Sequence, residues 1–293
     1  MFKAGRIAII GRPNVGKSTL LNVLVKEKLC IVSNKPETTR DNIQGILTGE
    51  NFQAVFVDTP GIHKPKNLLG KLMVRRATST LMEIDLIIVL IDARSGITED
   101  DVRIFQLLPK KPAFLIINKI DKTDRHRLLP IIKNAQKFSF NEIIPISAVK
   151  KDGTEIVFQK ILEYLPEGFP LFPEDQLTDK NERFSIREII REKALELTYQ
   201  EVPHSIAVSI EEMKEKKDRM NNDIWYIKAE IYVEKPSQKG IVIGKGGLML
   251  KKIGETARKE IENLLERKVF LDLHVKVFEN WRKDPFKLKT LGY

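Results

Sequence analysis

Gly11-Arg12-Pro13-Asn14-Val15-Gly16-Lys17-Ser18 lies between a short apolar run, Ile7–Ile10, and a segment of helical composition, Thr19–Leu24. A strand, a glycine-rich loop ending in Lys-Ser, and a helix form the context in which the pattern G-x-x-x-x-G-K-S/T binds phosphate. The glycines let the backbone approach a ligand, and the amides of the loop and of the helix N-terminus converge on phosphate oxygens. A glycine turn before an ordinary helix is the alternative, and the flanking elements make it the weaker one. We therefore predict a phosphate-binding P-loop.

The end of this loop carries the expected phosphate chemistry. The Lys17 ammonium can reach the β- and γ-phosphates of a nucleotide, which makes Lys17 a candidate catalytic residue. The Ser18 hydroxyl can bind Mg²⁺, and Thr19 follows it in the first helical turn. We expect residues 11–19 to contact the nucleotide.

Length and composition restrict the class of protein. The 293 residues suggest about two domains, and a hydrophobic content of 42% is enough for well-packed cores. The net charge of +10 favours a polyanionic partner, either nucleic acid or an anionic membrane surface. Cys30 is the only cysteine, and the N-terminal residues lead into the first strand without a signal-peptide pattern. No apolar run approaches the roughly 20 residues of a membrane span, so we expect a cytoplasmic protein.

Short apolar runs alternate with helix-like segments up to residue 165. Two of the runs, Asn42–Thr48 and Phe52–Val57, are separated by Gly49-Glu50-Asn51, which is typical of a hairpin turn. Strands that alternate with helices predict a doubly wound α/β domain with a mostly parallel sheet. The other predicted strands are Leu86–Ile91, Ala113–Ile117 and Ile143–Ile146, and the predicted helices span 66–82, 100–108, 125–138 and 153–165.

An acidic motif, Asp58-Thr59-Pro60-Gly61, follows the predicted strand Phe52–Val57. Ligands of such sheets bind beyond the carboxyl ends of the strands. Asp58 can hold Mg²⁺ through a water molecule, and the Gly61 amide can donate to a γ-phosphate. Gly61 is therefore a second candidate catalytic residue.

A second motif, Asn118-Lys119-Ile120-Asp121, follows the strand Ala113–Ile117. The Asp121 carboxylate can accept two hydrogen bonds from the N1–H and N2–H₂ edge of guanine, which adenine lacks. The Lys119 stem can lie on the base, and Asn118 can connect its loop to the P-loop. Ser147-Ala148 follows the next strand, and we expect its backbone to meet the guanine O6 atom.

Each motif is weak alone, but their order, each after an apolar run, argues against polar residues that merely end strands. The motifs at 11–18, 58–61, 118–121 and 147–148 resemble the G1, G3, G4 and G5 motifs of translation-factor-related GTPases. Glu37-Thr38-Thr39-Arg40-Asp41 lies where that family has its switch I threonine. The resemblance implies GTP, GDP and Mg²⁺ as ligands, with Thr39 completing the Mg²⁺ shell as a candidate catalytic residue. The residues alone do not distinguish Thr38 from Thr39. Residues 30–42 are then a loop ordered by the γ-phosphate.

Ile62, an expected nucleotide contact, departs from the pattern of Ras-like GTPases, which carry glutamine there to orient the attacking water. Isoleucine has no hydrogen-bonding group. The next residue, His63, is a weak candidate for a base, because an exposed loop histidine is more often inert. We therefore expect slow intrinsic hydrolysis, with water positioned by backbone, ions or a partner. Asn14 resembles the residue with which some GTPases of this group hold a catalytic K⁺.

A proline-rich stretch, Pro166–Pro173, ends the last predicted helix and precedes an acidic segment. We predict a G domain at 1–173, a linker at 174–183 and a second domain at 184–293. In the second domain, helical spacing at Ser185–Glu201 precedes two alternating segments, Ser205–Glu211 and Ile224–Val233. A long helix, Leu248–Leu265, and a strand, Val269–Phe278, follow.

Gly244-Lys245-Gly246-Gly247 matches the G-x-x-G loop that joins two helices in KH domains and clamps about four single-stranded nucleotides. The small residues permit close approach of the phosphate chain, Lys245 supplies charge, and two apolar neighbours are expected to line the groove for the bases. A second phosphate-binding loop or a simple turn is the alternative. The basic residues of the following helix are more often a solvated face than specific contacts; they are Lys251, Lys252, Arg258 and Lys259. The candidate RNA-binding residues are Ile241, Ile243, Gly244, Lys245, Gly246, Gly247, Lys251 and Lys252.

A G domain followed by a type II KH domain resembles the Era family of bacterial GTPases over nearly the whole chain, including Asn280–Lys283 and Thr290–Tyr293. The resemblance implies a GTP-hydrolysing, RNA-binding switch in 16S rRNA maturation and 30S subunit biogenesis. The KH domain would bind single-stranded RNA near the 3′ end of 16S rRNA, and the G domain would time binding and release. The family further implies a monomer with peripheral contact to the inner membrane, for which the sequence has no lipidation motif.

Two other functions are compatible with parts of the sequence. One is an RNA chaperone in which GTP is a sensing ligand with negligible turnover, and Ile62 keeps this alternative open. The other is a P-loop kinase, which is disfavoured because the motif at 118–121 has no role in one.

Overall fold

The computed structural model describes residues 1–33, 35, 38–65, 67–199, 201–217 and 220–293. Glu37, part of the predicted switch I motif, lies outside the described residues, as do Asn34 and Pro36 of the same loop. The chain divides into two compact units, and the main boundary falls between Asp179 and Lys180.

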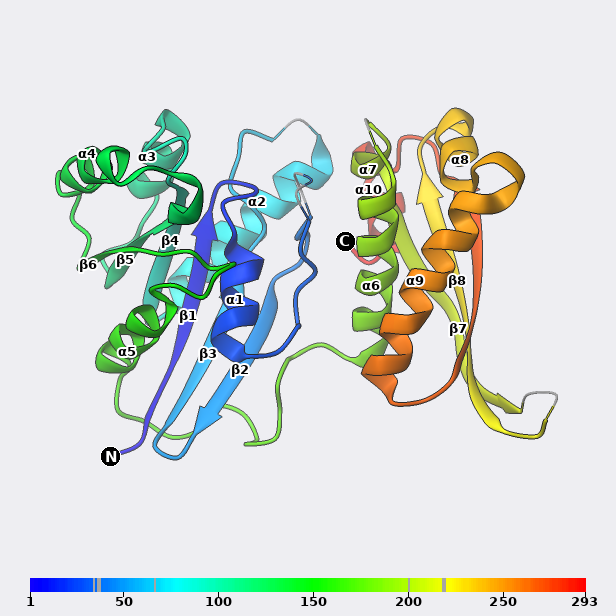
Figure 1. Cartoon of the computed structure of the whole chain (residues 1–293), viewed down its shortest axis with the longest axis horizontal. Helices are drawn as coiled ribbons and strands as arrows, with labels where there is room; N and C mark the ends of the chain where they lie inside the picture. The colour runs from blue at the N-terminus through cyan, green and yellow to red at the C-terminus, as the bar shows by residue number, and fades with distance from the viewer. Residues whose placement is uncertain (34, 36–37, 66, 200, 218–219) are drawn as a thin grey trace. The chain divides into compact units, whose positions relative to one another are not determined.

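The first unit is built on a sheet with the strand order β2-β3-β1-β4-β5-β6 (Figure 1). All neighbouring strands are parallel except β2, which forms a hairpin with β3. This confirms the predicted doubly wound, mostly parallel sheet. The strands are β1 (Lys3–Gly11), β2 (Ile43–Gly49), β3 (Phe52–Asp58), β4 (Leu86–Asp92), β5 (Ala113–Asn118) and β6 (Glu142–Pro145).

Helices cover both faces of this sheet. Buried aliphatic side chains of β1, β4 and β5 pack with those of α2, α3 and α4 on one face. On the other face α1 packs against β1, β2 and β3 and lies next to α5. The helices are α1 (Lys17–Val25), α2 (Leu68–Thr80), α3 (Glu99–Gln106), α4 (Arg125–Ala135) and α5 (Thr154–Tyr164).

The strand register brings the polar motifs to one edge of the sheet. Ile9 of β1 is paired with Asp58, the last residue of β3. Asp92 ends β4 directly beside Asn118, which ends β5. Because these strands are parallel, their carboxyl ends and the loops that follow them meet, which is where this class of sheet binds ligands.

The segment after α5 runs along the G domain. Gln53 is fully buried, accepts hydrogen bonds from the Leu171 and Phe172 amides and donates to the Phe172 carbonyl. Further along, the Ile46 amide donates to Leu177, at 2.8 Å. The first part of the expected linker, 174–179, thus belongs to the first compact unit, and the next helix begins at Glu182.

The second unit has the predicted order of helix, strand, strand, helix, loop, helix and strand. Strands β7 and β8 are antiparallel, β8 and β9 are parallel, and α6 and α9 pack on one face of this sheet (Figure 1). Its elements are α6 (Glu182–Leu197), α7 (Val202–Ser205), β7 (Ala207–Lys217), β8 (Asp223–Val233), α8 (Pro236–Ile243), α9 (Leu248–Leu265), β9 (Val269–Val277) and α10 (Pro285–Thr290). In the part of the chain that the structure describes, no helix is long and apolar enough to cross a bilayer.

Candidate functional site

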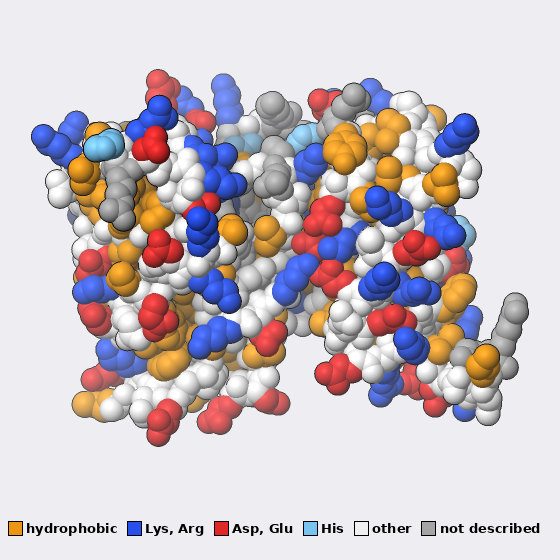
Figure 2. All heavy atoms as spheres, in the orientation of Figure 1, with side chains coloured by type: hydrophobic (Ala, Val, Ile, Leu, Met, Phe, Trp, Pro, Cys, Tyr) orange, Lys and Arg blue, Asp and Glu red, His pale blue; other side chains and the backbone are white. Residues whose placement is uncertain are grey.

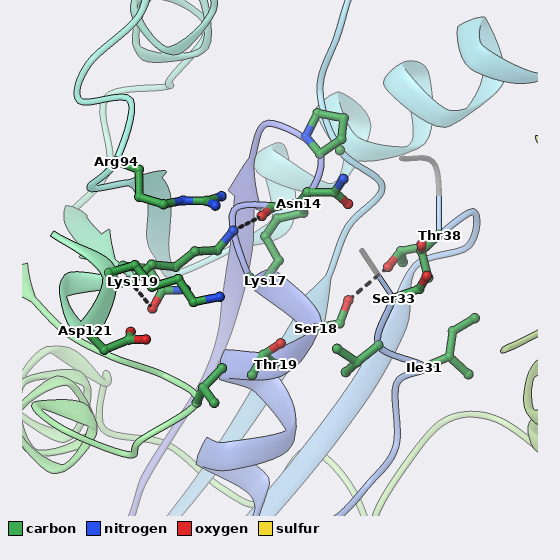
Figure 3. A pocket seen from close by; sticks show the side chains of 18 residues that line it. Asn14, Lys17, Ser18, Thr19, Ile31, Ser33, Thr38, Arg94, Lys119 and Asp121 are labelled. Atoms are coloured by element: carbon green, nitrogen blue, oxygen red, sulfur yellow. Dashed lines mark hydrogen bonds between the residues drawn. The ribbon is translucent and has the colours of Figure 1, made fainter. Parts of the chain in front are cut away.

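A pocket opens at the carboxyl edge of the larger sheet, where the P-loop passes from β1 to α1 (Figure 3). The P-loop, the switch I loop and the loop after β5 form its walls. Of the predicted nucleotide contacts, the following line it directly: Pro13, Asn14, Gly16, Lys17, Ser18, Thr19, Thr39, Gly61, Asn118, Lys119 and Asp121.

Close packing explains the second glycine of the P-loop. Gly16 has a φ of 104°, and a Cβ atom there would lie 2.2 Å from Asn118 Nδ2. Only glycine satisfies both the positive φ and the close approach. This contact puts the P-loop directly against the loop that is predicted to read guanine.

Lys17 is buried at the base of the pocket. Its Nζ atom donates to the carbonyls of Gly11 and Arg12, at 3.3 and 3.0 Å. Burial lowers the pKa of Lys17 to about 8, and the Asp58 carboxylate opposes that shift. A phosphate at this position would stabilise the charged ammonium, because its negative charge replaces the hydration that burial removes.

Three oxygen-bearing side chains from separate segments converge beside Lys17. Ser18 Oγ lies 2.6 Å from Asp58 Oδ2 and 2.9 Å from Thr39 Oγ1, and Thr39 Oγ1 lies 3.2 Å from Asp58 Oδ2. The Thr38 hydroxyl instead donates to the Lys35 carbonyl, at 2.6 Å. Thr39, and not Thr38, is therefore the threonine that contacts both Ser18 and Asp58.

This cluster fits a magnesium ion. Hydroxyl and carboxylate oxygens are ligands that Mg²⁺ prefers. Asp58 is fully buried, and its Oδ1 atom has no hydrogen-bond partner among the described residues. Burial raises the pKa of Asp58, against the opposing effects of Lys17 and of the hydrogen bonds from Ser18 and Thr39. A cation beside this carboxylate would remove the cost of burying its charge.

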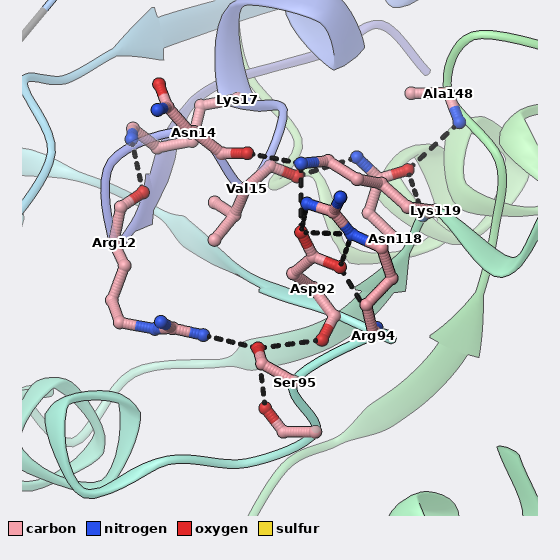
Figure 4. Close-up of polar contacts among 11 residues, drawn as sticks. Arg12, Asn14, Val15, Lys17, Asp92, Arg94, Ser95, Asn118, Lys119 and Ala148 are labelled. Carbon is pink, nitrogen blue, oxygen red and sulfur yellow. Dashed lines mark hydrogen bonds and ion pairs between the residues drawn. The ribbon is translucent and has the colours of Figure 1, made fainter. Parts of the chain in front are cut away.

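Asn118 connects the loop after β5 to its surroundings (Figure 4). Its Nδ2 atom donates to the Val15 carbonyl at 2.8 Å, and its Oδ1 atom accepts from the amides of Lys119 and Ala148, at 2.8 and 3.0 Å. One buried side chain thus holds together the P-loop, its own loop and the loop after β6. The predicted tie to the P-loop is present.

The Asp121 carboxylate lines the pocket, and its Oδ1 atom accepts a hydrogen bond from Ser147 Oγ at 2.7 Å. Ser147 and Ala148 therefore support Asp121 and Asn118 rather than lining the pocket. Ile120, which lies between Lys119 and Asp121, packs against the hydrophobic core between the sheet and helices α2, α3 and α4.

The segment after β3 packs tightly on the P-loop. A Cβ atom on Gly61 would lie 2.8 Å from the Pro13 nitrogen. The Ile62 amide donates to the Gly11 carbonyl at 3.1 Å, while its side chain is only 7% exposed and belongs to the core. The Nδ1 atom of His63 lies 2.8 Å from the Gly61 carbonyl. The side chain at position 62 is thus directed into the core.

Other predicted contacts act from behind the pocket. Arg12 pairs with Asp101 of α3 at 2.8 Å, and Thr59 donates to the Ile9 carbonyl at 2.9 Å. Pro60 is buried. Several residues that line the pocket belong to none of the predicted motifs. Two features of the sequence would have indicated them. Three belong to the predicted loop at 30–42, and the other three follow the carboxyl ends of β4, β5 and β6. These residues are Ile31, Val32, Ser33, Arg94, Lys122 and Val149.

The loop between α8 and α9 has a backbone that favours glycine. Gly244, Gly246 and Gly247 have φ values of 74°, 60° and 79°. A Cβ atom on Gly244 would lie 2.7 Å from Met249 Cβ, whereas nothing lies within 4 Å of such an atom on Gly246 or Gly247. Gly244 therefore serves packing, while Gly246 and Gly247 leave open space over the loop. The Lys245 side chain is exposed beside them.

A groove lies between α9 and β9, next to this loop. Phe270, at 56% exposure, and Leu271 give it an apolar floor, and Arg258 adds positive charge. Figure 2 shows further Lys and Arg side chains over the face of the unit where α9 runs. Ile241 and Ile243 are not part of this groove; Ile243 packs against the core, and Ile241 is 47% exposed on α8. Its lining residues are Gly247, Leu250, Lys251, Gly254, Glu255, Arg258, Phe270, Leu271 and Leu273.

The fold and the two sites define a P-loop GTPase that carries a C-terminal KH domain. Family models agree: the 50S ribosome-binding GTPase model matches residues 6–119, and the KH domain model matches residues 201–282.

Curated relatives identify the family. GTPase Era of Ruminiclostridium cellulolyticum is 50% identical over 295 positions, which cover 100% of this chain and 98% of that protein. GTPase Era of Clostridium acetobutylicum is 50% identical with the same coverage. This chain therefore belongs to the Era family of GTPases: it binds and hydrolyses GTP, and it has an RNA-binding KH domain.

Solved structures of this family superpose on the chain. A crystal structure of Era in complex with MgGDPNP and nucleotides 1506–1542 of 16S ribosomal RNA has a TM-score of 0.96 and 45% identity. A variant of Aquifex aeolicus Era bound to GDP and aluminium fluoride has a TM-score of 0.95 and 45% identity. Each match covers 100% of this chain and 99% of the other.

Proposed function

We propose that this GTPase is a nucleotide-controlled switch that binds the single-stranded 3′ end of 16S rRNA and acts in 16S rRNA maturation and assembly of the 30S subunit. The observation that carries the proposal is the joining of switch I to the P-loop through Thr39, Ser18 and Asp58 in a chain that also has an open G-x-x-G loop. The related Era bound to nucleotides 1506–1542 of 16S rRNA supports this choice of RNA.

In the proposed nucleotide complex, the Lys17 ammonium binds the β- and γ-phosphates, and the P-loop amides bind the phosphate oxygens. Asp121 accepts the N1–H and N2–H₂ donors of guanine, while the Lys119 stem covers one face of the base. Asn118 keeps these two halves of the pocket together through its bonds to Val15 and Ala148.

The proposed Mg²⁺ ligands are Ser18, Thr39 and, through water, Asp58. When bound, the ion neutralises the charge that develops between the β- and γ-phosphates. The chain's own contribution is to hold three oxygens within hydrogen-bond distance of one another before the ion arrives. When the γ-phosphate is lost, Thr39 keeps only its contacts with Ser18 and Asp58. In the proposed cycle these contacts are too weak to hold the loop, and switch I is released.

The Gly61 amide is the proposed donor to the γ-phosphate, and its close contact with Pro13 fixes that position. The Ile62 side chain is buried in the core and cannot orient water. We therefore expect slow intrinsic hydrolysis that a partner or an ion accelerates. Asn14 lines the pocket and is the proposed K⁺ contact; equal rates in K⁺ and Na⁺ would remove that role.

The proposed RNA site combines the loop at 244–247 with the groove between α9 and β9. Gly246 and Gly247 leave room for a phosphate backbone, Lys245 and Lys251 supply charge, and apolar residues of the groove face the bases. Phe270 offers an exposed aromatic ring on which a base can stack.

Gly246 permits a sharp test. Its φ of 60° and ψ of 21° are tolerated by Asp and Asn, and a Cβ atom there would have no neighbouring atom within 4 Å. Gly246→Asp adds a negative charge, and Gly246→Asn is the matched uncharged control. GTP hydrolysis is measured with and without a single-stranded RNA of the 16S 3′ end. Stimulation of the wild type and of Gly246→Asn, and its loss in Gly246→Asp, supports the switch.

Burial of Ile62 also supports the second candidate, an RNA chaperone in which GTP is a sensing ligand. This chaperone function predicts tight GTP binding with turnover near zero that RNA does not change.

A role in 30S assembly predicts that cells relying on Gly246→Asp accumulate unprocessed 16S rRNA. We infer from the family a cytoplasmic monomer with peripheral contact to the inner membrane; vesicle flotation and light scattering test these two points.

A further inference from the structure

Asp92 occupies a position at the nucleotide pocket that the motifs above do not explain. It ends β4 beside Asn118 of β5 and is only 7% exposed. Its carboxylate accepts hydrogen bonds from Arg94 and from Lys119, whose Nζ atom lies 2.9 Å from Asp92 Oδ2 (Figure 4). Burial opposes the charged form of Asp92, but these hydrogen bonds outweigh it and hold its pKa well below the usual range.

Lys119 is held at two points. Its ammonium donates to Asp92 on one side and to the Asn14 carbonyl of the P-loop on the other. Lysine has four flexible side-chain bonds, and ordering them costs entropy, which hydrogen bonds to a fixed head group offset before the nucleotide binds. The two acceptors therefore determine where the Lys119 stem lies.

Arg94 completes the arrangement. Its Nε and Nη2 atoms donate to Asp92, which is the only side-chain acceptor for this guanidinium among the described residues. Arg94 is also 52% exposed and lines the same pocket as Lys119 and Asp121. Arg94 and Lys119 thus both neutralise Asp92, Arg94 with a half-exposed guanidinium and Lys119 with a more buried ammonium.

The turn that carries Arg94 is tied to the P-loop as well. The Asp92 carbonyl accepts the amides of Ser95 and Gly96, both at 3.1 Å. Arg12 donates to Ser95 Oγ at 2.9 Å and pairs with Asp101. The Asp92–Arg94 pair is therefore fixed relative to the phosphate-binding loop.

We propose that Asp92 and Arg94 form a bracket that positions Lys119 over the guanine base and so sets the residence time of the bound nucleotide. The inference rests on the proposed function, because it assumes that Lys119 and Asp121 contact guanine. Asp92 is a positioning residue: it acts through Lys119 and does not touch the nucleotide. Without it the ammonium keeps only the Asn14 carbonyl, and the stem is free to swing off the base.

The alternative is that Asp92 only stabilises the turn after β4. The two explanations differ in a double-mutant cycle, because a residue that acts through Lys119 loses its effect once Lys119 is truncated. A purely structural role would persist without the lysine side chain.

The measured quantity is the dissociation rate of a fluorescent GDP analogue from the full chain. We expect Asp92→Asn to accelerate dissociation about tenfold, because it removes a charged acceptor in a partly buried site. Arg94→Ala, which removes a half-exposed partner, should accelerate it about threefold. In the Lys119→Ala background both changes should fall below about twofold. Asp85→Asn is the matched control, since Asp85 accepts the Arg6 amide beside the opposite end of β4.

Equal acceleration by Asp92→Asn with and without Lys119, or no acceleration at all, would overturn the proposal. If thermal unfolding shows that Asp92→Asn is not folded, Arg94→Ala gives the same cycle and the same decision.

Asp121→Asn separates this inference from the proposed function: if guanine is read as proposed, that variant should prefer xanthosine diphosphate over GDP. A preference unchanged from the wild type would count against the guanine site itself. If Asp121→Asn prefers xanthosine diphosphate but the Asp92 and Arg94 variants release GDP at the wild-type rate, only the proposed bracket is refuted.

Discussion

Replacing Asn118 by alanine should separate the two halves of the nucleotide pocket. The wild-type side chain is 2% exposed and makes three hydrogen bonds, to the Val15 carbonyl and to the amides of Lys119 and Ala148. At about 1 kcal/mol for each bond, the variant loses about 3 kcal/mol of interaction. If most of this loss falls on the bound arrangement, the affinity for GDP drops about 100-fold.

The assay is calorimetric titration of GDP, with thermal unfolding of the same samples. Asn141→Ala is a matched control, because Asn141 Oδ1 accepts the Ala113 amide at 2.9 Å at the opposite end of β5. We expect that control to bind GDP within about twofold of the wild type. An Asn118→Ala protein that unfolds at lower temperature yet binds GDP normally would refute the reasoning, because the bonds would then serve only stability.

Three further changes test other parts of the pocket. Gly61→Ala places a Cβ atom 2.8 Å from the Pro13 nitrogen and so displaces the Gly61 amide. It should slow GTP hydrolysis about 100-fold while GDP affinity changes little. A wild-type rate in single-turnover kinetics would contradict the role of this amide. Thr39→Ala should weaken Mg²⁺-dependent binding of GTP more than binding of GDP, and Thr38→Ala should leave both largely unchanged; the reverse order in nucleotide competition would show that Thr38 is the ligand. Because burial puts the pKa of Lys17 near 8, the free protein must take up a proton to bind phosphate at higher pH, and GDP affinity should fall between pH 8 and 9. Guanosine, which has no phosphate, should bind equally across that range, and a flat GDP profile would contradict the assignment.

The nucleotide site was largely predictable because each of its motifs follows an apolar run. Parallel strands bring their carboxyl ends to one edge, so motifs far apart in sequence had to meet there. Two neighbouring threonines, by contrast, have the same chemistry in sequence. Only the folded loop distinguishes Thr39, which reaches Ser18, from Thr38, which turns back to Lys35.

Arg94 was missed because an arginine after a strand has no motif. Its significance comes from Asp92 and Lys119, which approach it only when β4 and β5 pair. The linker shows a similar limit of composition. A proline-rich, then acidic, segment predicts a linker that begins at residue 174, yet the Ile46 amide donates to the Leu177 carbonyl and residues 174–179 belong to the first compact unit.

The KH domain was predictable in its order of elements but not in its groove. The charged end of β7 breaks the alternation that predicts a strand, and a register shift between Ile210 and Glu212 adds to the break. The groove joins one face of α9 with the edge strand β9, and no spacing along the chain reports that contact. Phe270 therefore came from the structure, and so did the place of Arg258 in the groove, which the sequence left on a solvated helix face; the apolar residues predicted on α8 lie outside the groove.

The central claim is that the nucleotide controls RNA binding, and linkage requires the control to be reciprocal. The most direct measurement is the affinity of a single-stranded RNA of the 16S 3′ end for the full chain, once with Mg²⁺ and GDPNP and once with GDP. The account predicts affinities that differ at least about tenfold, with an equal shift of nucleotide affinity when RNA is saturating. Equal RNA affinities in the two states would contradict it.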